Sequence, residues 1–250
     1  MKIQFKTLSV LITTLFFALL SISAFNQSDI DAQKIIDKSI KKQNGKKVAK
    51  GSFSFDFRKY HYTYKRNQGS FEYTRKHKET GVKDILTNDG IKRMSDGKEV
   101  ILTEKQKGSY SRSVNSVHYF TFLPYFLNDP AVGKELIGEA EIKGKTYHKI
   151  RVTFDQDGGG DDHDDIYIYW IDTDDYSLDY LAYSFRVNGG GVRFRSAYNP
   201  RKVGGVLFQD YVNFKHDKDT PVEDLDLLFD SNELIELSRI ELTSIKKEAN

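Results

Sequence analysis

The sequence has no cysteine, only four prolines and one tryptophan, and almost no excess of either charge. Without cysteine, disulfide bonds, thiol catalysis and a lipid anchor attached through a cysteine are all excluded. The net charge of +2 falls to zero if Lys2 and Lys6 are removed with the segment described next, because 36 basic residues then balance 36 acidic ones. A neutral chain lacks the basic surface that nucleic-acid binding needs, so we expect no nucleic-acid partner.

Long hydrophobic runs are also scarce, and the clearest one lies near the N-terminus. Lys2 and Lys6 precede an apolar run from Leu8 to Leu20, and small residues follow as far as Ala24. The run is shorter than the roughly 20 residues that span a bilayer. This order predicts a signal peptide over residues 1–24, cleaved near Ala24, and therefore a periplasmic or secreted protein without a transmembrane segment after cleavage.

Aromatic residues are plentiful, with 17 Phe and 15 Tyr, and such residues favour strands. Phe53, Phe55 and Phe57 alternate along one face. Tyr residues at 60, 62 and 64 alternate in the other phase, which predicts a β-bulge near Arg58-Lys59 in a single curved strand. Further strands, joined by short turns and therefore antiparallel, are expected over residues 71–73, 82–87, 91–94, 100–102, 147–154, 166–171, 178–187, 192–197, 206–214 and 234–245.

Helical patterns occur at two places. Ser28 and Asp31 resemble a capping box, and apolar residues then recur at three- and four-residue spacing until Asn44-Gly45. The apolar segment from Val114 to Leu127 contains Pro124 and predicts either a short, kinked helix or two helical turns. We expect one domain over residues 25–250 that is mainly β (α+β): a large curved antiparallel sheet, or half-barrel, with an N-terminal helix and a mid-chain helical lid.

Several short motifs carry a resemblance to known families. The stretches Phe120–Tyr125, Asp161–Asp165, Tyr169–Asp172 and Gly190–Arg195 resemble an uncharacterised family of exported Bacteroidota proteins. The order of elements, with Tyr169–Asp172 ending one strand and Leu178 beginning the next, resembles the periplasmic lipoprotein-localisation factors LolA and LolB. The second resemblance implies a half-barrel with an apolar cavity under helical lids, which holds lipid or acyl chains.

The segment from Asp155 to Asp165 holds six carboxylates among eleven residues, together with three glycines. Carboxylate oxygens are the ligands that Ca²⁺ prefers. The start of the segment matches an EF-hand loop, but Ile166 stands where that loop needs its closing glutamate. Two interpretations stay open: an exposed acidic loop, or a Ca²⁺ site, which is the one cofactor the sequence suggests, with ligands Asp155, Asp157, Asp161 and Asp162.

Candidate ligand-binding residues lie on the strands and on the mid-chain helical segment. Arg193 and Arg195 share one strand face beside the hairpin at 188–191, where guanidinium groups could receive a phosphate or carboxylate, or pair with the acidic loop. Aromatic side chains would line the cavity. The aromatic residues that we expect there are Phe55, Tyr62, Phe120, Phe122, Phe126 and Trp170.

These features predict a carrier or sensor of a hydrophobic ligand, either lipid or another small acyl molecule, with no catalytic residue and with an envelope protein as a further partner. The first alternative is a calcium-stabilised module that binds glycans or proteins through the Asp155–Asp165 loop. The second is a hydrolase that would use His163 and Asp172. No Gly-x-Ser-x-Gly motif supports it.

Overall fold

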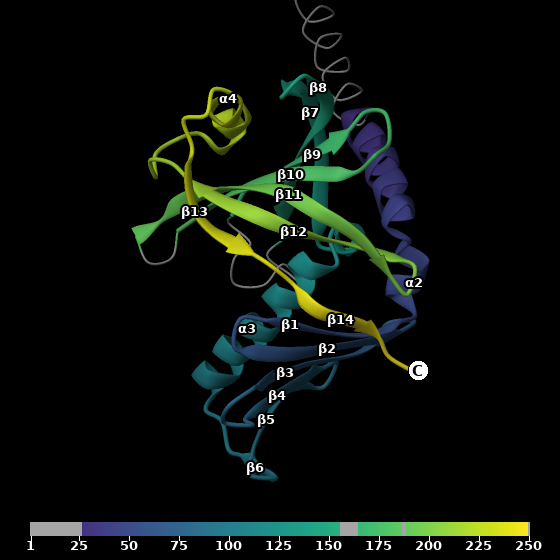
Figure 1. Ribbon diagram of the computed structural model, residues 1–250, viewed down its shortest axis with the longest axis vertical. Coiled ribbons are helices and arrows are strands. Elements are labelled where there is room, and N and C mark those ends of the chain that lie inside the picture. Colours follow the sequence, from purple (N-terminus) through teal and green to yellow (C-terminus); the bar gives the residue numbers. More distant parts are fainter. Residues whose placement is uncertain (1–26, 156–164, 187–188, 250) are drawn as a thin grey trace, which may run out of the picture.

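The computed structural model describes residues 27–155, 165–186 and 189–249. Two open, seven-stranded antiparallel sheets dominate it, which confirms the predicted mainly β half-barrel with helices (Figure 1). The first helix covers residues 27–43, as the sequence predicted, and is followed by α2 (Gly45–Ala49). Within the described ranges, the chain has no helix that combines the length and apolarity needed to cross a bilayer.

Each sheet is built mainly from neighbours along the chain. Sheet A contains β1 (Ser52–Phe57), β2 (Tyr60–Asn67), β3 (Ser70–His77), β4 (Lys83–Thr87), β5 (Gly90–Ser95), β6 (Lys98–Val100) and β14 (Thr243–Lys247). Sheet B contains β7 (Val132–Ile142), β8 (Lys145–Phe154), β9 (Tyr167–Asp172), β10 (Leu178–Phe185), β11 (Gly191–Val203), β12 (Val206–Lys215) and β13 (Ile235–Ile240).

The segment from β13 to β14 joins the two sheets. β13 pairs with β12 at the edge of sheet B, and β14 pairs with β1 at the edge of sheet A. Only Glu241 and Leu242 separate the two strands. Figure 1 shows this yellow segment passing from one sheet to the other, so the sheets form two halves of one curved wall.

Some helical elements lie between the two sheets, and others lie on the outer face of sheet B. Helix α3 (Glu104–Thr121) packs against β3, β4 and β5 of sheet A, and the 3₁₀ turn η1 (Tyr125–Asn128) follows it. The turn η3 (Val222–Asp224) and helix α4 (Leu225–Asp230) pack on the outer face of sheet B. The interior between the sheets is therefore occupied by α3 and η1, whereas α4 lies outside it (Figure 1).

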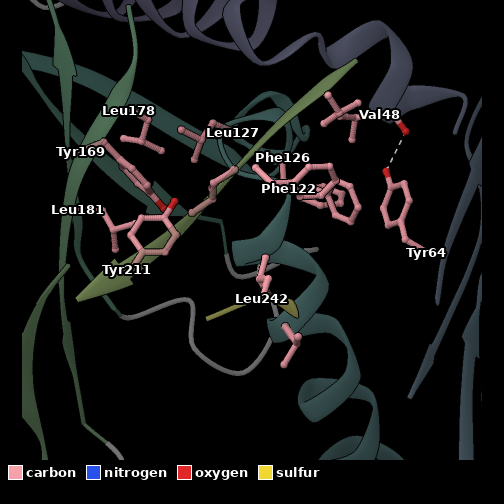
Figure 2. Packing of buried hydrophobic residues seen from close by; sticks show 14 of the residues in the cluster. Val48, Tyr64, Phe122, Phe126, Leu127, Tyr169, Leu178, Leu181, Tyr211 and Leu242 are labelled. Carbon is pink, nitrogen blue, oxygen red and sulfur yellow. Dashed lines mark hydrogen bonds between the residues drawn. The ribbon is translucent and has the colours of Figure 1, made fainter. Parts of the chain in front are cut away.

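The two faces of sheet B belong to different hydrophobic clusters, because successive side chains of a strand point to opposite faces. Tyr169 and Ile171 join the main cluster between the sheets, part of which is drawn in Figure 2. Ile168 and Trp170 join a second cluster beneath η3 and α4.

Four local predictions were wrong. Arg58 and Lys59 form a two-residue hairpin turn between β1 and β2 instead of a bulge, with Phe57 paired to Tyr60 and Arg58 at a positive φ of 53°. Helix α3 begins ten residues earlier than predicted, after a capping box between Thr103 and Gln106. The prediction from sequence also missed β7 and joined β13 to β14.

Candidate functional site

The interior between the two sheets is lined by aromatic side chains from both sheets. β1 and β2 are antiparallel neighbours in sheet A, with Phe55 paired to Tyr62. The two rings stack, with their centroids 5.3 Å apart and their planes inclined by 7°. Of the six aromatic residues singled out in the sequence, the structure places five in or against the main cluster: Phe55, Tyr62, Phe120, Phe122 and Phe126. These residues come from β1, β2, α3 and the turn after it, so the fold brings them together.

Trp170 lies elsewhere. It is fully buried in the second cluster, on the outer face of sheet B, where its indole N–H donates to Asp226 at 3.0 Å. Lys149 pairs with the same carboxylate at 2.9 Å. The surroundings of Trp170 thus form a closed packing contact between sheet B and α4.

The segment of residues 114–128, called the inner segment below, fills the interior. Phe122 is fully buried, and its ring centroid lies 3.9 Å from that of Tyr64, 5.7 Å from that of Phe53 and 5.5 Å from that of Phe208. A cavity of about 10 Å³, enough for one water molecule, lies beneath the first helix beside Leu123. No acyl chain fits into a cavity of that size.

Arg195 on β11 faces the interior without an acidic partner among the described residues. Its Nη2 donates to the Tyr183 hydroxyl at 3.2 Å, and its guanidinium carbon lies 5.5 Å from the centre of the Phe120 ring. Within the described part of the chain its buried Nε has no hydrogen-bond partner. The ring of Phe120 also contacts that of Phe57 at 5.5 Å, so Phe120 bridges sheet A and Arg195 on sheet B.

Besides Tyr183, the hydroxyls of Tyr169 and Tyr211 lie within electrostatic range of Arg195. The groups that act electrostatically on the Tyr169 hydroxyl are Tyr119, Tyr167, Tyr211 and Arg195. Figure 2 shows Tyr169 and Tyr211 pointing from sheet B into the interior with their hydroxyl ends toward each other. Burial raises the pKa of Tyr169 well above its usual value and that of Tyr211 to about 12, so both groups stay protonated at neutral pH.

The other predicted head-group residue, Arg193, is placed differently. Its guanidinium carbon lies 4.8 Å from the centre of the Phe185 ring, and its Nη1 donates to the carbonyl of Val192 at 2.8 Å. These contacts lie at the 185–193 end of the hairpin, and they include none of the tyrosines around Tyr169. Arg195 alone of the two joins the interior cluster.

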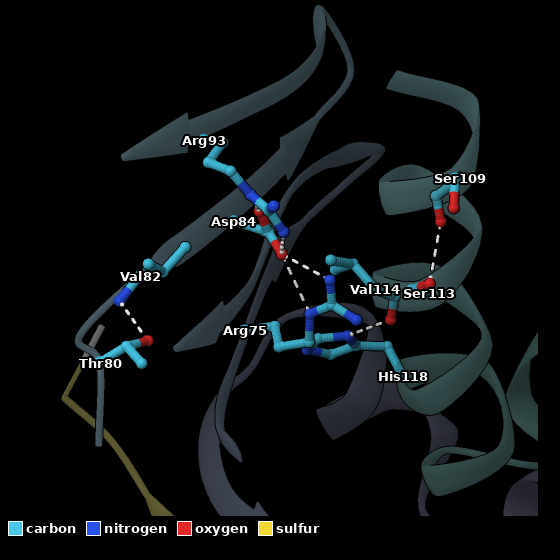
Figure 3. Close-up of polar contacts among 9 residues, drawn as sticks. All are labelled: Arg75, Thr80, Val82, Asp84, Arg93, Ser109, Ser113, Val114 and His118. Carbon is cyan, nitrogen blue, oxygen red and sulfur yellow. Dashed lines mark hydrogen bonds and ion pairs between the residues drawn. The ribbon is translucent and has the colours of Figure 1, made fainter. Parts of the chain in front are cut away.

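Sheet A carries a second set of interior arginines, which the sequence did not reveal. The buried Asp84 carboxylate accepts from Arg75 Nη2 at 2.6 Å and from Arg93 Nε at 2.6 Å, as Figure 3 shows. The guanidinium carbon of Arg93 lies 3.4 Å from the centre of the Tyr110 ring on α3. This network fixes α3 against sheet A.

His118 lies beside that network on α3 and is fully buried (Figure 3). Its Nδ1 is 2.9 Å from the carbonyl oxygen of Val114 and its Nε2 is 3.0 Å from that of Thr63. Burial lowers the pKa of His118 to about 4, although the two carbonyls oppose this shift. A neutral imidazole carries a single N–H, so it donates to only one of these two acceptors.

The residues of the two alternative functions fall largely outside the described chain. Of the calcium ligands, Asp155 is exposed, whereas Asp157, Asp161 and Asp162 lie outside the described residues, as does His163 of the hydrolase. Asp172 is buried and accepts from the backbone N–H groups of Asp174 and Asp175, which makes it a turn-capping residue. Across the described ranges, no group of three or more His, Asp or Glu side chains is arranged to hold a metal ion.

A family described as "Family of unknown function (DUF6503)" matches residues 7–242. The chain belongs to this family. A comparison with curated proteins finds no match.

Among solved structures, this DUF6503 chain is similar to a LolA superfamily protein from Nitrosomonas europaea, with a TM-score of 0.51, 10% identity, and coverage of 88% of this chain and 94% of that one. It is also similar to a DUF1329 family protein from Desulfovibrio piger, with a TM-score of 0.52, 8% identity, and coverage of 87% and 93%. At this identity the likeness shows the fold, a LolA-like open half-barrel.

Proposed function

We propose that the protein is an exported, non-catalytic carrier or sensor of a hydrophobic ligand that binds between the two sheets. The observation that carries this proposal is the interior itself. Two sheets enclose a space lined by aromatic side chains, and that space is filled by one continuous stretch, the inner segment, instead of by side chains of the sheets alone. In this proposal the ligand takes the place of inner-segment side chains such as Phe120, while the sheets and the Asp84 network that holds α3 stay in place.

The energetics favour an acyl or similar apolar ligand. Burial of apolar surface contributes about 0.8 kcal/mol per CH₂ group, so a long acyl chain that replaces the inner segment recovers much of the contact that its rings provide. Phe122 of the inner segment packs against Tyr64 of sheet A and Phe208 of sheet B, so binding between the sheets requires the inner segment to move. The LolA-like fold and the signal peptide expected over residues 1–24 support the same proposal, since a resemblance to LolA and LolB implies lipid binding.

The proposal is tested with a neutral, apolar dye, N-phenyl-1-naphthylamine, whose fluorescence rises in apolar surroundings. The informative variant is Phe120→Ala, because this partly buried ring bridges Phe57 and Arg195 across the two sheets. Its removal should ease entry and speed association of the dye. The matched control is Phe229→Ala, another partly buried phenylalanine, which packs on Phe194 at 4.8 Å in the outer cluster and should leave dye binding unchanged.

A wild-type protein that takes up no dye, or a Phe229→Ala variant that alters uptake while Phe120→Ala does not, would contradict binding between the sheets. Circular dichroism checks that both variants fold. Native mass spectrometry of protein purified from its own cells, followed by organic extraction, then identifies the cargo of the intact protein.

A further inference from the structure

We propose that Arg195, together with the tyrosine hydroxyls around Tyr169, forms a receptor for the carboxylate head of a long-chain fatty acid. This inference rests on the proposed function and names the class of ligand. It starts from an imbalance between hydrogen-bond donors and acceptors at one place in the interior.

The cluster contains more donors than the described chain satisfies. Among the residues that the structure describes, neither the buried Arg195 Nε nor the buried Tyr119 hydroxyl has a hydrogen-bond partner. The hydroxyls of Tyr183 and Tyr211 accept from Arg195 and Gln209, respectively, which leaves the proton of each hydroxyl to donate. A buried polar group without a partner is costly, so a ligand that brings acceptor atoms would complete the site.

The single positive charge of the cluster favours a head group with one negative charge. Arg195 supplies one positive charge, and among the described residues no carboxylate pairs with it. The surrounding phenols stay neutral because burial raises the pKa of Tyr169 and of Tyr211. A monoanion balances this charge, whereas a dianion would bring an uncompensated charge into an apolar interior. A carboxylate also has the planar pair of oxygens that matches a guanidinium fork.

The cluster lies beside the inner segment, whose place an acyl chain behind the head group would take. The Phe120 ring lies 5.5 Å from the guanidinium carbon, and the aromatic residues of the inner segment continue from it into the main cluster. A carboxylate at Arg195 would therefore leave its acyl chain along the path that the inner segment now occupies. The cation–ring contacts with Phe120 and Tyr183 would hold Arg195 in place while the site is empty.

The test compares three ligands with the same sixteen-carbon chain: palmitate, methyl palmitate and hexadecanol. Binding to the full mature chain is measured by displacement of N-phenyl-1-naphthylamine. The wild type should bind palmitate about 10- to 100-fold more tightly than the ester, the range expected for hydrogen bonds to a charged group. Arg195→Met should remove this preference and leave the affinity for the ester and the alcohol unchanged.

The matched control is Arg193→Met, two residues along the same strand, where the guanidinium lies over Phe185. This variant should keep the preference for palmitate. Equal affinity of the wild type for acid and ester, or an equal loss in both arginine variants, would overturn the receptor while leaving a hydrophobic carrier intact. If none of the three ligands displaces the dye from any variant, although the dye itself binds, then long acyl chains are not the ligand and the receptor fails with them.

Discussion

On sheet A, the interior arginines Arg75 and Arg93 share the Asp84 carboxylate, whereas on sheet B the interior arginine Arg195 has a tyrosine hydroxyl and two aromatic rings. Both sets face the same half-barrel interior, and both contact helix α3, through Tyr110 and through Phe120. Only the first set receives a counter-charge from the described chain.

This difference distinguishes a cation that stabilises the fold from a cation that is available to a ligand. Removing charges from water is costly, and a structural cation therefore recovers that cost from a fixed partner with several hydrogen bonds. Asp84 provides four such bonds to two arginines, at distances from 2.6 to 3.0 Å. Among the described residues Arg195 has no such partner, as is expected of a residue whose partner is a ligand that binds and dissociates. The comparison yields three predictions, beginning with the largest effect.

Asp84→Asn should lower the free energy of unfolding by about 3–5 kcal/mol, because it leaves the buried Arg75 and the partly buried Arg93 without their shared anion. Urea denaturation followed by circular dichroism measures the change. The matched control is Asp31→Asn on the first helix, where the exposed pair with Lys34 at 3.0 Å contributes little to stability because solvent screens it. Similar losses in the two variants would show that the Asp84 network is not a structural centre.

Acidification should lower the free energy of unfolding through His118, which lies on α3 beside sheet A. Its pKa is about 4 in the folded protein, because of burial, and about 6.5 when unfolded, so the unfolded chain binds more protons between these values. The contribution of His118 is fully present above about pH 6.5 and is lost as the pH falls toward 4. Between pH 7 and pH 5 the free energy of unfolding should fall by about 2 kcal/mol from this group alone.

Denaturation of the wild type and of His118→Gln at both pH values isolates this contribution, because the other titrating groups are common to the two proteins. The variant should show the smaller fall. If the wild type instead gains stability relative to the variant at pH 5, the imidazole is charged in the folded protein and donates to both Val114 and Thr63.

Arg195→Met should change the free energy of unfolding of the empty protein by less than about 1 kcal/mol, because methionine keeps the apolar contacts and removes an uncompensated charge. The same substitution at Arg75 should cost more, since it takes two hydrogen bonds from Asp84. Thermal unfolding of the two variants after delipidation compares them. A loss at Arg195 as large as that at Arg75 would mean that Arg195 is itself structural.

Much of the fold could be predicted from the sequence because its turns carry strong local signals. The Asp-Gly pairs at Asp89-Gly90 and Asp96-Gly97 predict hairpins, and both lie at the expected turns. The turn at Arg58-Lys59 was missed because neither residue is typical of a position that needs a positive φ. The early start of α3 had a signal, Thr103 followed by Gln106, but the polar residues after it hid the helix.

The candidate site was harder to predict, because its residues lie on different strands and come together only through the register in which those strands pair. Arg195 could be singled out on β11, but Tyr169, Tyr183 and Tyr211 come from three other strands of sheet B. Alternation shows that Tyr169 and Trp170 face opposite sides of β9. It does not tell which side is the interior, and so Trp170 was placed with the wrong neighbours in the prediction from sequence.

The strand pair β1 and β14 also bears on how the molecule assembles. Phe53 pairs with Lys247, whereas most other strand pairs join elements that follow each other directly in the chain. Contacts between distant residues require closure of a long loop, and such closure slows folding. We therefore expect the hairpins of each sheet to form first and the seam between the sheets to close late, so that the space between them is the last part of the molecule to take shape.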